Sequence, residues 1–133
     1  MFPCRQVSIS IDRPPADNYE FASNPANLPR WARGIGDSID NVNGEWVAAS
    51  PIGSVKVRFA DRNPYGVLDH AVTLPSGETI DNPMRVVPND TGCELTFTLF
   101  RRPGMTDAAF EADAAAVAAD FATLKALLDA HED

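Results

Sequence analysis

The sequence contains few residues of the kinds that usually carry cofactor or metal chemistry. Cys4 and Cys93 are its only cysteines, and His70 and His131 are its only histidines. These residues are far apart and lack metal-ligand spacing. A disulfide between the cysteines is disfavoured in a reducing compartment, so we expect two free thiols. The sequence also has neither a phosphate-binding glycine loop nor a Gly-x-Ser-x-Gly motif. We therefore expect no cofactor and no metal.

Long apolar runs are also missing. No stretch of about 18 apolar residues is present, so we expect no membrane span. The first residues, Met1 to Gln6, lack the charged-then-apolar layout of a signal peptide. A cytoplasmic protein is therefore expected.

Basic residues are outnumbered by acidic ones. Eleven Lys and Arg stand against nineteen Asp and Glu, which gives a net charge of −8. No basic patch of the kind that binds nucleic acid is visible, so we expect no nucleic-acid partner. The acids gather near the C-terminus, at Asp107, Glu111, Asp113, Asp120, Asp129, Glu132 and Asp133. They predict a solvated helix face, or alternatively a docking face for a basic partner.

Alternating apolar residues predict strands through most of the chain. The first is expected at residues 6–12, where Val7, Ile9 and Ile11 alternate with serines. After two short proline-started helices at residues 16–22 and 25–31, six further strands are expected. Their ranges are 38–42, 45–49, 54–61, 67–74, 79–87 and 93–101. Asn43-Gly44 predicts a hairpin turn, and Pro83 predicts a bulge or an edge position in its strand.

One long amphipathic helix is expected from Thr106 to about His131. Its apolar residues recur at steps of four and three, which places them on one stripe: Phe110, Ala114, Val117, Phe121, Leu124 and Leu128. Such a stripe needs a broad apolar surface to pack against, and the strands upstream provide the only candidate. The order of elements predicts one α+β domain over residues 1–133. We expect a helix-grip fold, in which a seven-stranded antiparallel sheet wraps around the C-terminal helix.

The segment from Pro14-Pro15 through Tyr19-Glu20-Phe21 and Asn24-Pro25 to Trp31 resembles the opening of the SRPBCC superfamily. This superfamily includes START domains, birch-pollen-allergen-like proteins and polyketide cyclases, and the likeness is greatest to small bacterial polyketide cyclase-like members. The resemblance covers almost the whole chain and implies binding of an apolar or amphipathic ligand between the sheet and the long helix. It implies no catalytic residue, because the superfamily hosts many activities.

His70 is the main polar candidate for the inside of such a cavity. We expect Phe59 to face Leu68 and Val57 to face His70, which places His70 on the apolar face of its strand. A shift of one residue would turn Asp69 inward instead. Either side chain is a candidate for catalysis, since both can exchange protons with a ligand.

Other candidate ligand contacts come from several elements. Asn82 can form hydrogen bonds with a ligand, or alternatively a local hydrogen bond at the bulge near Pro83. Met84 can form an adaptable apolar part of the cavity wall. Trp31 follows the second short helix, which often lies by the entrance of such cavities. The remaining candidates are apolar residues of the strands and the long helix: Phe59, Phe97, Val117 and Phe121.

Three functions are compatible with the sequence. The first is binding of a small hydrophobic or amphipathic molecule, by a monomer or a homodimer. The second is a polyketide cyclase or dehydratase that uses His70 or Asp69. The third is a protein-interaction module that uses the acidic final helix. The sequence assigns no reaction and names no ligand.

Overall fold

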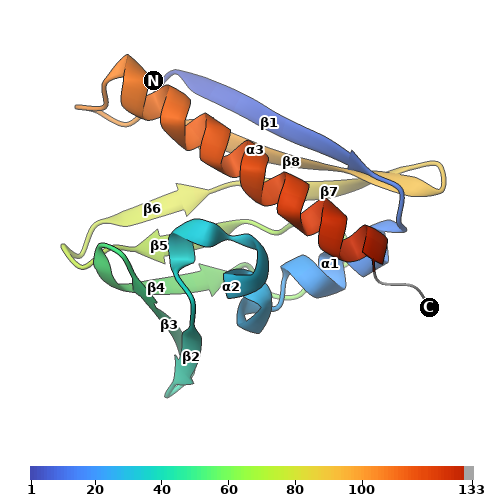
Figure 1. The fold of residues 1–133 in the computed structure, drawn as a ribbon, viewed down its shortest axis with the longest axis horizontal. Helices are drawn as coiled ribbons and strands as arrows, with labels where there is room; N and C mark the ends of the chain where they lie inside the picture. The colour runs from blue at the N-terminus through green and yellow to red at the C-terminus, as the bar shows by residue number, and fades with distance from the viewer. Residues whose placement is uncertain (131–133) are drawn as a thin grey trace.

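The computed structural model describes residues 1–130 and has the α+β architecture expected from the sequence (Figure 1). One strand and a group of short helices precede a run of strands, and a long helix closes the chain. The short helical elements are α1 (Pro15–Ala22), η1 (Pro25–Asn27), α2 (Leu28–Trp31) and η2 (Arg33–Ile35). The strands are β1 (Cys4–Ile11), β2 (Ile39–Val42), β3 (Glu45–Ser50), β4 (Gly53–Phe59), β5 (His70–Thr73), β6 (Thr79–Asn82), β7 (Met84–Asn89) and β8 (Gly92–Phe100), and the long helix is α3 (Asp107–Ala130).

The strands form two antiparallel sheets rather than one. The smaller has the order β1-β8-β7 and the larger the order β2-β3-β4-β5-β6. The expected strand over residues 79–87 divides at Pro83, which has no N–H to donate to a ladder. The carbonyl of Pro83 still accepts a hydrogen bond from Thr98 N at 3.0 Å, so the chain passes directly from one sheet to the other. The helix-grip fold is confirmed, with this seam between the two sheets.

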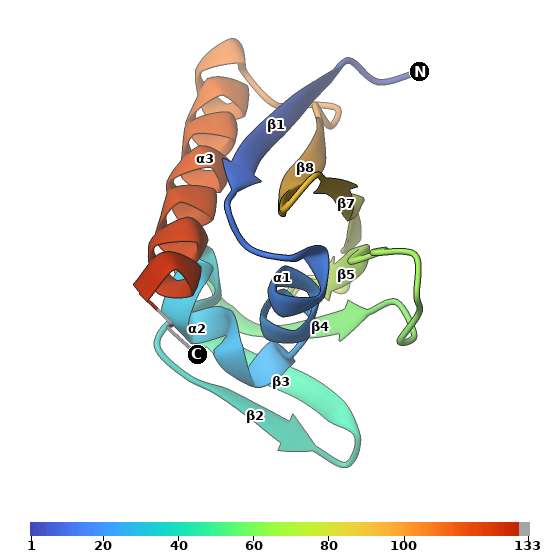
Figure 2. The same cartoon turned by 90° about the vertical axis from the view of Figure 1, so that its right-hand side faces the viewer.

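α3 lies diagonally across the sheets, and the short helices cover the end of the molecule near its C-terminus (Figures 1 and 2). Thr106 caps the helix, since its hydroxyl accepts a hydrogen bond from Ala109 N at 3.1 Å. The expected stripe faces inward, with Ala114, Phe121, Leu124 and Leu128 buried. The expected helix end at His131 falls outside the described residues.

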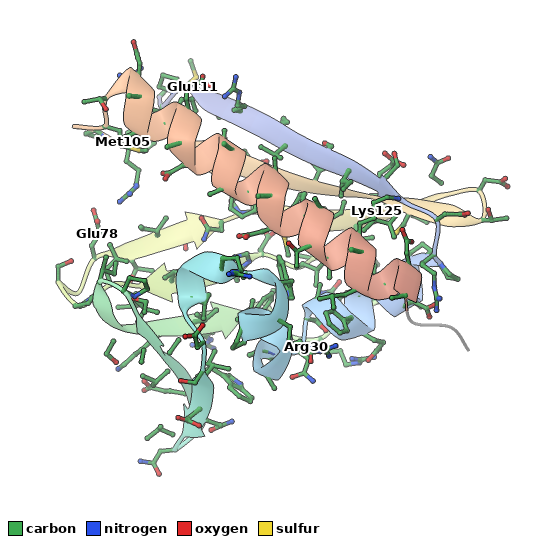
Figure 3. All side chains as sticks on the ribbon, viewed as in Figure 1. Arg30, Glu78, Met105, Glu111 and Lys125 are labelled. Carbon is green, nitrogen blue, oxygen red and sulfur yellow. The ribbon has the colours of Figure 1, made fainter. Side chains whose placement is uncertain are left out.

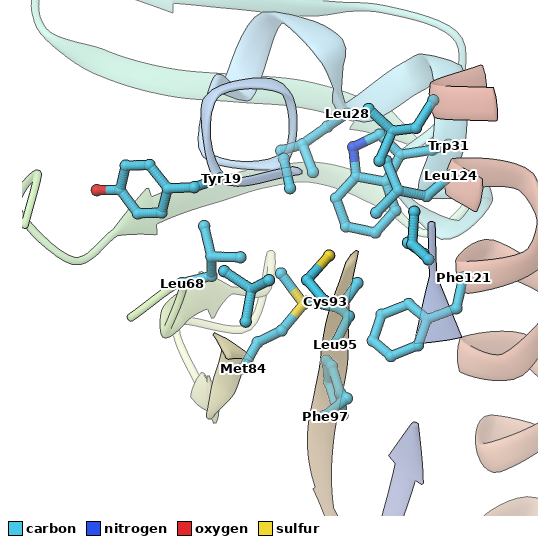
Figure 4. Packing of buried hydrophobic residues seen from close by; sticks show 14 of the residues in the cluster. Tyr19, Leu28, Trp31, Leu68, Met84, Cys93, Leu95, Phe97, Phe121 and Leu124 are labelled. Carbon is cyan, nitrogen blue, oxygen red and sulfur yellow. The ribbon is translucent and has the colours of Figure 1, made fainter. Parts of the chain in front are cut away.

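The core lies between α3, the short helices and the concave side of the sheets (Figure 4). Leu95 and Leu124 are fully buried and Phe121 is 1% exposed. β1 and β8 present one common apolar face because Val7 is paired with Phe97 and Ile9 with Leu95. This face supplies the broad apolar surface that the stripe of α3 requires.

The predicted pairing of β4 with β5 was wrong by two residues. Val57 is opposite Val72, and Phe59 is opposite His70. Leu68 does not reach β4, because its N–H donates to the Met84 carbonyl at 2.8 Å and ties it to β7. A shift of two residues preserves the face on which each side chain lies, so His70 still shares a face with Val72.

The two cysteines lie at opposite ends of the β1–β8 pair and are both free thiols, as expected. Cys4 is exposed and Cys93 is buried. Among residues 1–130, no helix is long and apolar enough to cross a membrane, and no group of side chains could hold a metal ion.

Candidate functional site

A chamber of about 190 Å³ lies between α3, the α2–η2 segment and the concave side of the two sheets. Its walls are mostly aliphatic and aromatic, as is usual for small-molecule sites. Its few polar side chains are His70, Asn82, Asp120 and the indole of Trp31. The full lining is Leu28, Trp31, Ala32, Gly34, Ile35, Val57, His70, Val72, Asn82, Met84, Phe97, Val117, Asp120 and Phe121.

Most of the candidates drawn from the sequence meet in this chamber. Its lining includes Trp31, His70, Asn82, Met84, Phe97, Val117 and Phe121. Phe59 does not line it. The Phe59 ring instead stacks against the His70 ring, with centroids 4.9 Å apart and an angle of 27° between the ring planes. Phe59 therefore holds the imidazole in place rather than forming part of the wall.

His70 is held as a neutral imidazole with a defined tautomer. Its Nδ1 lies 3.0 Å from the Leu68 carbonyl oxygen, which can only accept, so Nδ1 carries the proton. Burial lowers the pKa of His70 and is the largest influence on it, outweighing that hydrogen bond and the nearby charge of Asp69. Nε2 is then an acceptor, and no described residue gives it a hydrogen bond.

Asp69 lies on the other side of the sheet, which decides between the two residues left open by the sequence. Its carboxylate pairs with Arg85 at 2.9 Å and accepts a hydrogen bond from Met84 N at 2.8 Å. The hydrogen bond from Arg85 is the main reason that the pKa of Asp69 is lowered. Asp69 therefore fastens the residue just before β5 to β7 across the seam, and His70 is the residue that faces the chamber.

Asp120 is a chamber residue that the sequence assigned to the solvated acidic face of the long helix. It lies three residues after Val117 and four before Leu124, so it borders the stripe on the helix surface. Its Oδ1 accepts a hydrogen bond from Arg33 N at 3.3 Å, which joins α3 to η2. Burial is the main cause that raises the pKa of Asp120. The α2–η2 residues Leu28, Ala32, Gly34 and Ile35 were also missed, although Trp31 at the centre of that segment pointed to them.

Replacing Asp120 with asparagine is expected to stabilise the protein at neutral pH. Folding raises the pKa of this carboxyl group, so the folded state binds protons more tightly than the unfolded state. The carboxyl group therefore lowers the stability of the fold most at pH values above its folded pKa, where it is charged in both states. At pH 7 the asparagine avoids the partly buried charge and can still accept from Arg33 N. We expect a rise in Tm of about 1–4 °C at pH 7. This gain should shrink as the pH falls towards the ordinary aspartate value of about 3.9.

Asp113→Asn is the matched control, because Asp113 lies two turns earlier on the same helix and is exposed. Thermal unfolding of the three proteins at several pH values measures the effect. An equal gain in both variants would assign it to the net charge of the helix rather than to the burial of Asp120.

The chamber continues into a wider depression of about 650 Å³ at the molecular surface. Gly34, Val72 and Asn82 line both spaces, so the two are contiguous. The outer part lies between β6, the end of β8 and the start of α3, and includes Ile80 and Leu99. This depression, called the vestibule below, borders the chamber on its solvent side.

The acidic face of α3 is partly neutralised by neighbouring bases. Glu111 pairs with Arg5 at 2.6 Å, and Asp107 pairs with Arg101. Lys125 lies 3.7 Å from Asp129 and also donates to the Ser10 carbonyl at 3.1 Å (Figure 3 labels Glu111 and Lys125). Glu132 and Asp133 fall outside the described residues. The pairs with Arg5 and Arg101 connect α3 to β1 and to the turn before the helix. They neutralise part of the negative charge on this face of α3.

A grip of antiparallel sheets on one long helix, with an apolar chamber between them, defines a class of small-molecule-binding domains. The family model described as polyketide cyclase / dehydrase and lipid transport matches residues 5–129. The chain belongs to this family, in agreement with the resemblance to the SRPBCC superfamily.

Solved structures share the fold at low sequence identity. Ara h 8.0201 superposes with a TM-score of 0.73 at 14% identity, covering 98% of this chain and 100% of that one. XoxI from Bacillus cereus gives 0.75 at 14% identity, covering 97% and 99%. DynU16 from the dynemicin biosynthetic locus gives 0.72 at 14% identity, covering 96% of this chain but 47% of its own length. No curated protein sequence matches the chain significantly.

Proposed function

We propose that the protein binds a small hydrophobic or amphipathic molecule in the chamber and vestibule between its sheets and α3. The observation that carries the proposal is the chamber itself, about 190 Å³ with mainly apolar walls and a wider surface depression beside it. Family membership supports it, because the family description includes lipid transport. The roles of the lining residues as ligand contacts are part of the same proposal.

A chamber-filling variant tests the proposal. Val117 lies on the α3 wall and is only half-buried, so Val117→Phe adds bulk to the chamber without crowding a closed core. We expect hydrophobic compounds found by native mass spectrometry or thermal shift to bind this variant at least ~10-fold more weakly. The matched control is Val87→Phe, which makes the same change at a residue that is 48% exposed. Unchanged binding to Val117→Phe, or no bound compound from a hydrophobic library, would reject the proposal.

A polyketide cyclase or dehydratase activity is the second candidate. The observation that favours it is the neutral His70, whose unpaired Nε2 could remove a proton from a substrate in the chamber. His70→Ala is expected to abolish turnover of any accepted substrate. Turnover at the wild-type rate in this variant would reject the mechanism.

We propose a cytoplasmic monomer or homodimer without a nucleic-acid partner, which is consistent with the net charge of −8. A role of α3 as a docking face is less favoured, since Asp107, Glu111 and Asp129 already have basic partners. Co-purification of a partner at low salt, lost at high salt, would favour that role.

A further inference from the structure

His70 and Asn82 form a polar pair among the mainly apolar residues that the sheets contribute to the chamber. They are directly opposite each other in the β5–β6 ladder, so their side chains lie on the same face of the sheet. Both line the chamber. Neither His70 Nε2 nor the side-chain amide of Asn82 has a hydrogen-bond partner among residues 1–130. Hydrogen-bonding capacity left open inside a site is available to a ligand.

The two groups offer complementary chemistry. The bond to the Leu68 carbonyl leaves His70 Nε2 as an acceptor, and the amide of Asn82 supplies a donor beside it. A ligand group that donates one hydrogen bond and accepts another satisfies both. A hydroxyl group does this with a single oxygen atom, whereas a methyl group leaves both protein groups unpaired.

The charges around the chamber disfavour an anionic ligand. No lysine or arginine lines it, and its one carboxyl group belongs to Asp120. Arg102, the basic residue that lines the vestibule, pairs with Glu78 at 3.2 Å. The acidic residues Asp81 and Asp113 line the same depression. A carboxylate in the chamber would lose water without gaining a cationic partner, which is costly.

The volume of the chamber limits the part of the ligand that enters it. An apolar protein cavity of about 150 Å³ is known to take up benzene. The present chamber of about 190 Å³ is slightly larger, so it accommodates one six-membered ring with one or two small substituents. Any larger portion of a ligand would extend through the vestibule.

We propose that the chamber is selective for a neutral hydroxylated ring, such as a phenol, whose hydroxyl group donates to His70 Nε2 and accepts from the Asn82 amide. This inference rests on the proposed ligand-binding function and specifies the chemical class of the ligand. It separates the protein from carriers of fatty-acid carboxylates, which need a cationic side chain at the head group.

Three para-substituted toluenes test the inference: p-cresol, its near-isostere p-xylene, and the anion p-toluate. Their dissociation constants are measured at pH 7 by calorimetry or ligand-observed NMR with the wild-type protein. We expect p-cresol to bind at least ~10-fold more tightly than either of the others, because only it satisfies both polar groups. In His70→Phe and in Asn82→Leu the preference for p-cresol over p-xylene should fall, and in the double variant it should be about one. His70→Phe retains a ring against Phe59, so loss of packing does not explain that result.

A second pair of variants locates the site. His70 and Asn82 also border a depression of about 300 Å³ on the outer surface at the seam. Arg58 lines this depression but does not line the chamber. Val117→Phe should weaken p-cresol binding at least ~10-fold, and Arg58→Gln should leave it unchanged. Binding that survives Val117→Phe but is lost in Arg58→Gln would move the site to the seam and overturn the inference.

The outcomes separate this inference from the function on which it rests. If p-xylene binds as tightly as p-cresol and Val117→Phe blocks both, the chamber binds ligands but does not select a hydroxyl group. If p-toluate binds most tightly, the charge argument fails. If no probe binds and no larger hydrophobic compound does either, the proposed function itself fails. If only larger compounds bind, the size argument is overturned.

Discussion

Replacing Phe121 with alanine is expected to lower the free energy of unfolding by about 3–5 kcal/mol. Phe121 is 1% exposed and lies at the centre of the α3 stripe. Its ring packs edge-on against Phe97 of β8, with centroids 6.4 Å apart (Figure 4). Removing the ring costs the transfer free energy of a large apolar group and leaves a cavity next to the existing chamber. Chemical denaturation monitored by circular dichroism measures the loss.

Val117→Ala is the matched control on the same helix stripe. Val117 is only half-buried and loses two methyl groups rather than a ring, so we expect a loss of about 1 kcal/mol. Phe121→Ala should also enlarge the chamber and admit ligands larger than one ring. A loss below 1 kcal/mol for Phe121→Ala would mean that α3 is not held to the sheets mainly through this side chain.

The stripe of α3 was predictable because a helix with one buried face repeats its apolar residues at steps of three and four. The β2–β3 hairpin was predictable for a local reason as well. Its turn residues, Asn43 and Gly44, have φ values of +53° and +88°, and asparagine followed by glycine adopts this pair of conformations most readily. In both cases the signal lies within a few neighbouring residues, and tertiary packing agrees with it.

The pairing between distant strands was less predictable from the sequence. The expected alignment of β4 and β5 assumed a continuous ladder from residue 67, whereas Leu68 is hydrogen-bonded to Met84 and Val67 is bridged to Arg85. This exchange depends on the division of the strand at Pro83, which gives residues 67 and 68 a second sheet to join. A proline in the sequence indicates that a strand is interrupted. It does not indicate which other strand residues 67 and 68 then pair with.

The candidate site was predictable where alternation placed residues on one face, as for His70, Asn82 and Met84. It was less predictable where the wall is irregular. η2 follows α2 directly and has no long periodic pattern, so Gly34 and Ile35 gave no signal. Asp120 was missed because a charged residue beside an apolar stripe normally faces solvent, and only the docking of η2 on α3 covers it.

Gly66→Ala is expected to lower the free energy of unfolding by about 2–4 kcal/mol, although the change adds a single methyl group. Gly66 has φ +72°, a conformation that alanine adopts at a cost of about 1–2 kcal/mol. A Cβ atom at this position would lie 2.1 Å from the Val86 carbonyl oxygen, which is backbone and cannot turn aside. The same residues are joined by a 2.9 Å hydrogen bond from Val86 N to the Gly66 carbonyl. The substitution therefore pushes the 62–69 loop away from β7.

Gly77→Ala separates the two causes. Gly77 also has a positive φ, +91°, but a Cβ atom there would meet no heavy atom within 4 Å. We expect this control to lose only the conformational part, about 1–2 kcal/mol. The excess loss in Gly66→Ala then measures the close approach of the loop to β7. Because Leu68 and His70 follow directly, that excess should be accompanied by weaker ligand binding in the chamber. Equal losses in the two variants would show that the loop tolerates displacement and that the position of His70 does not depend on it.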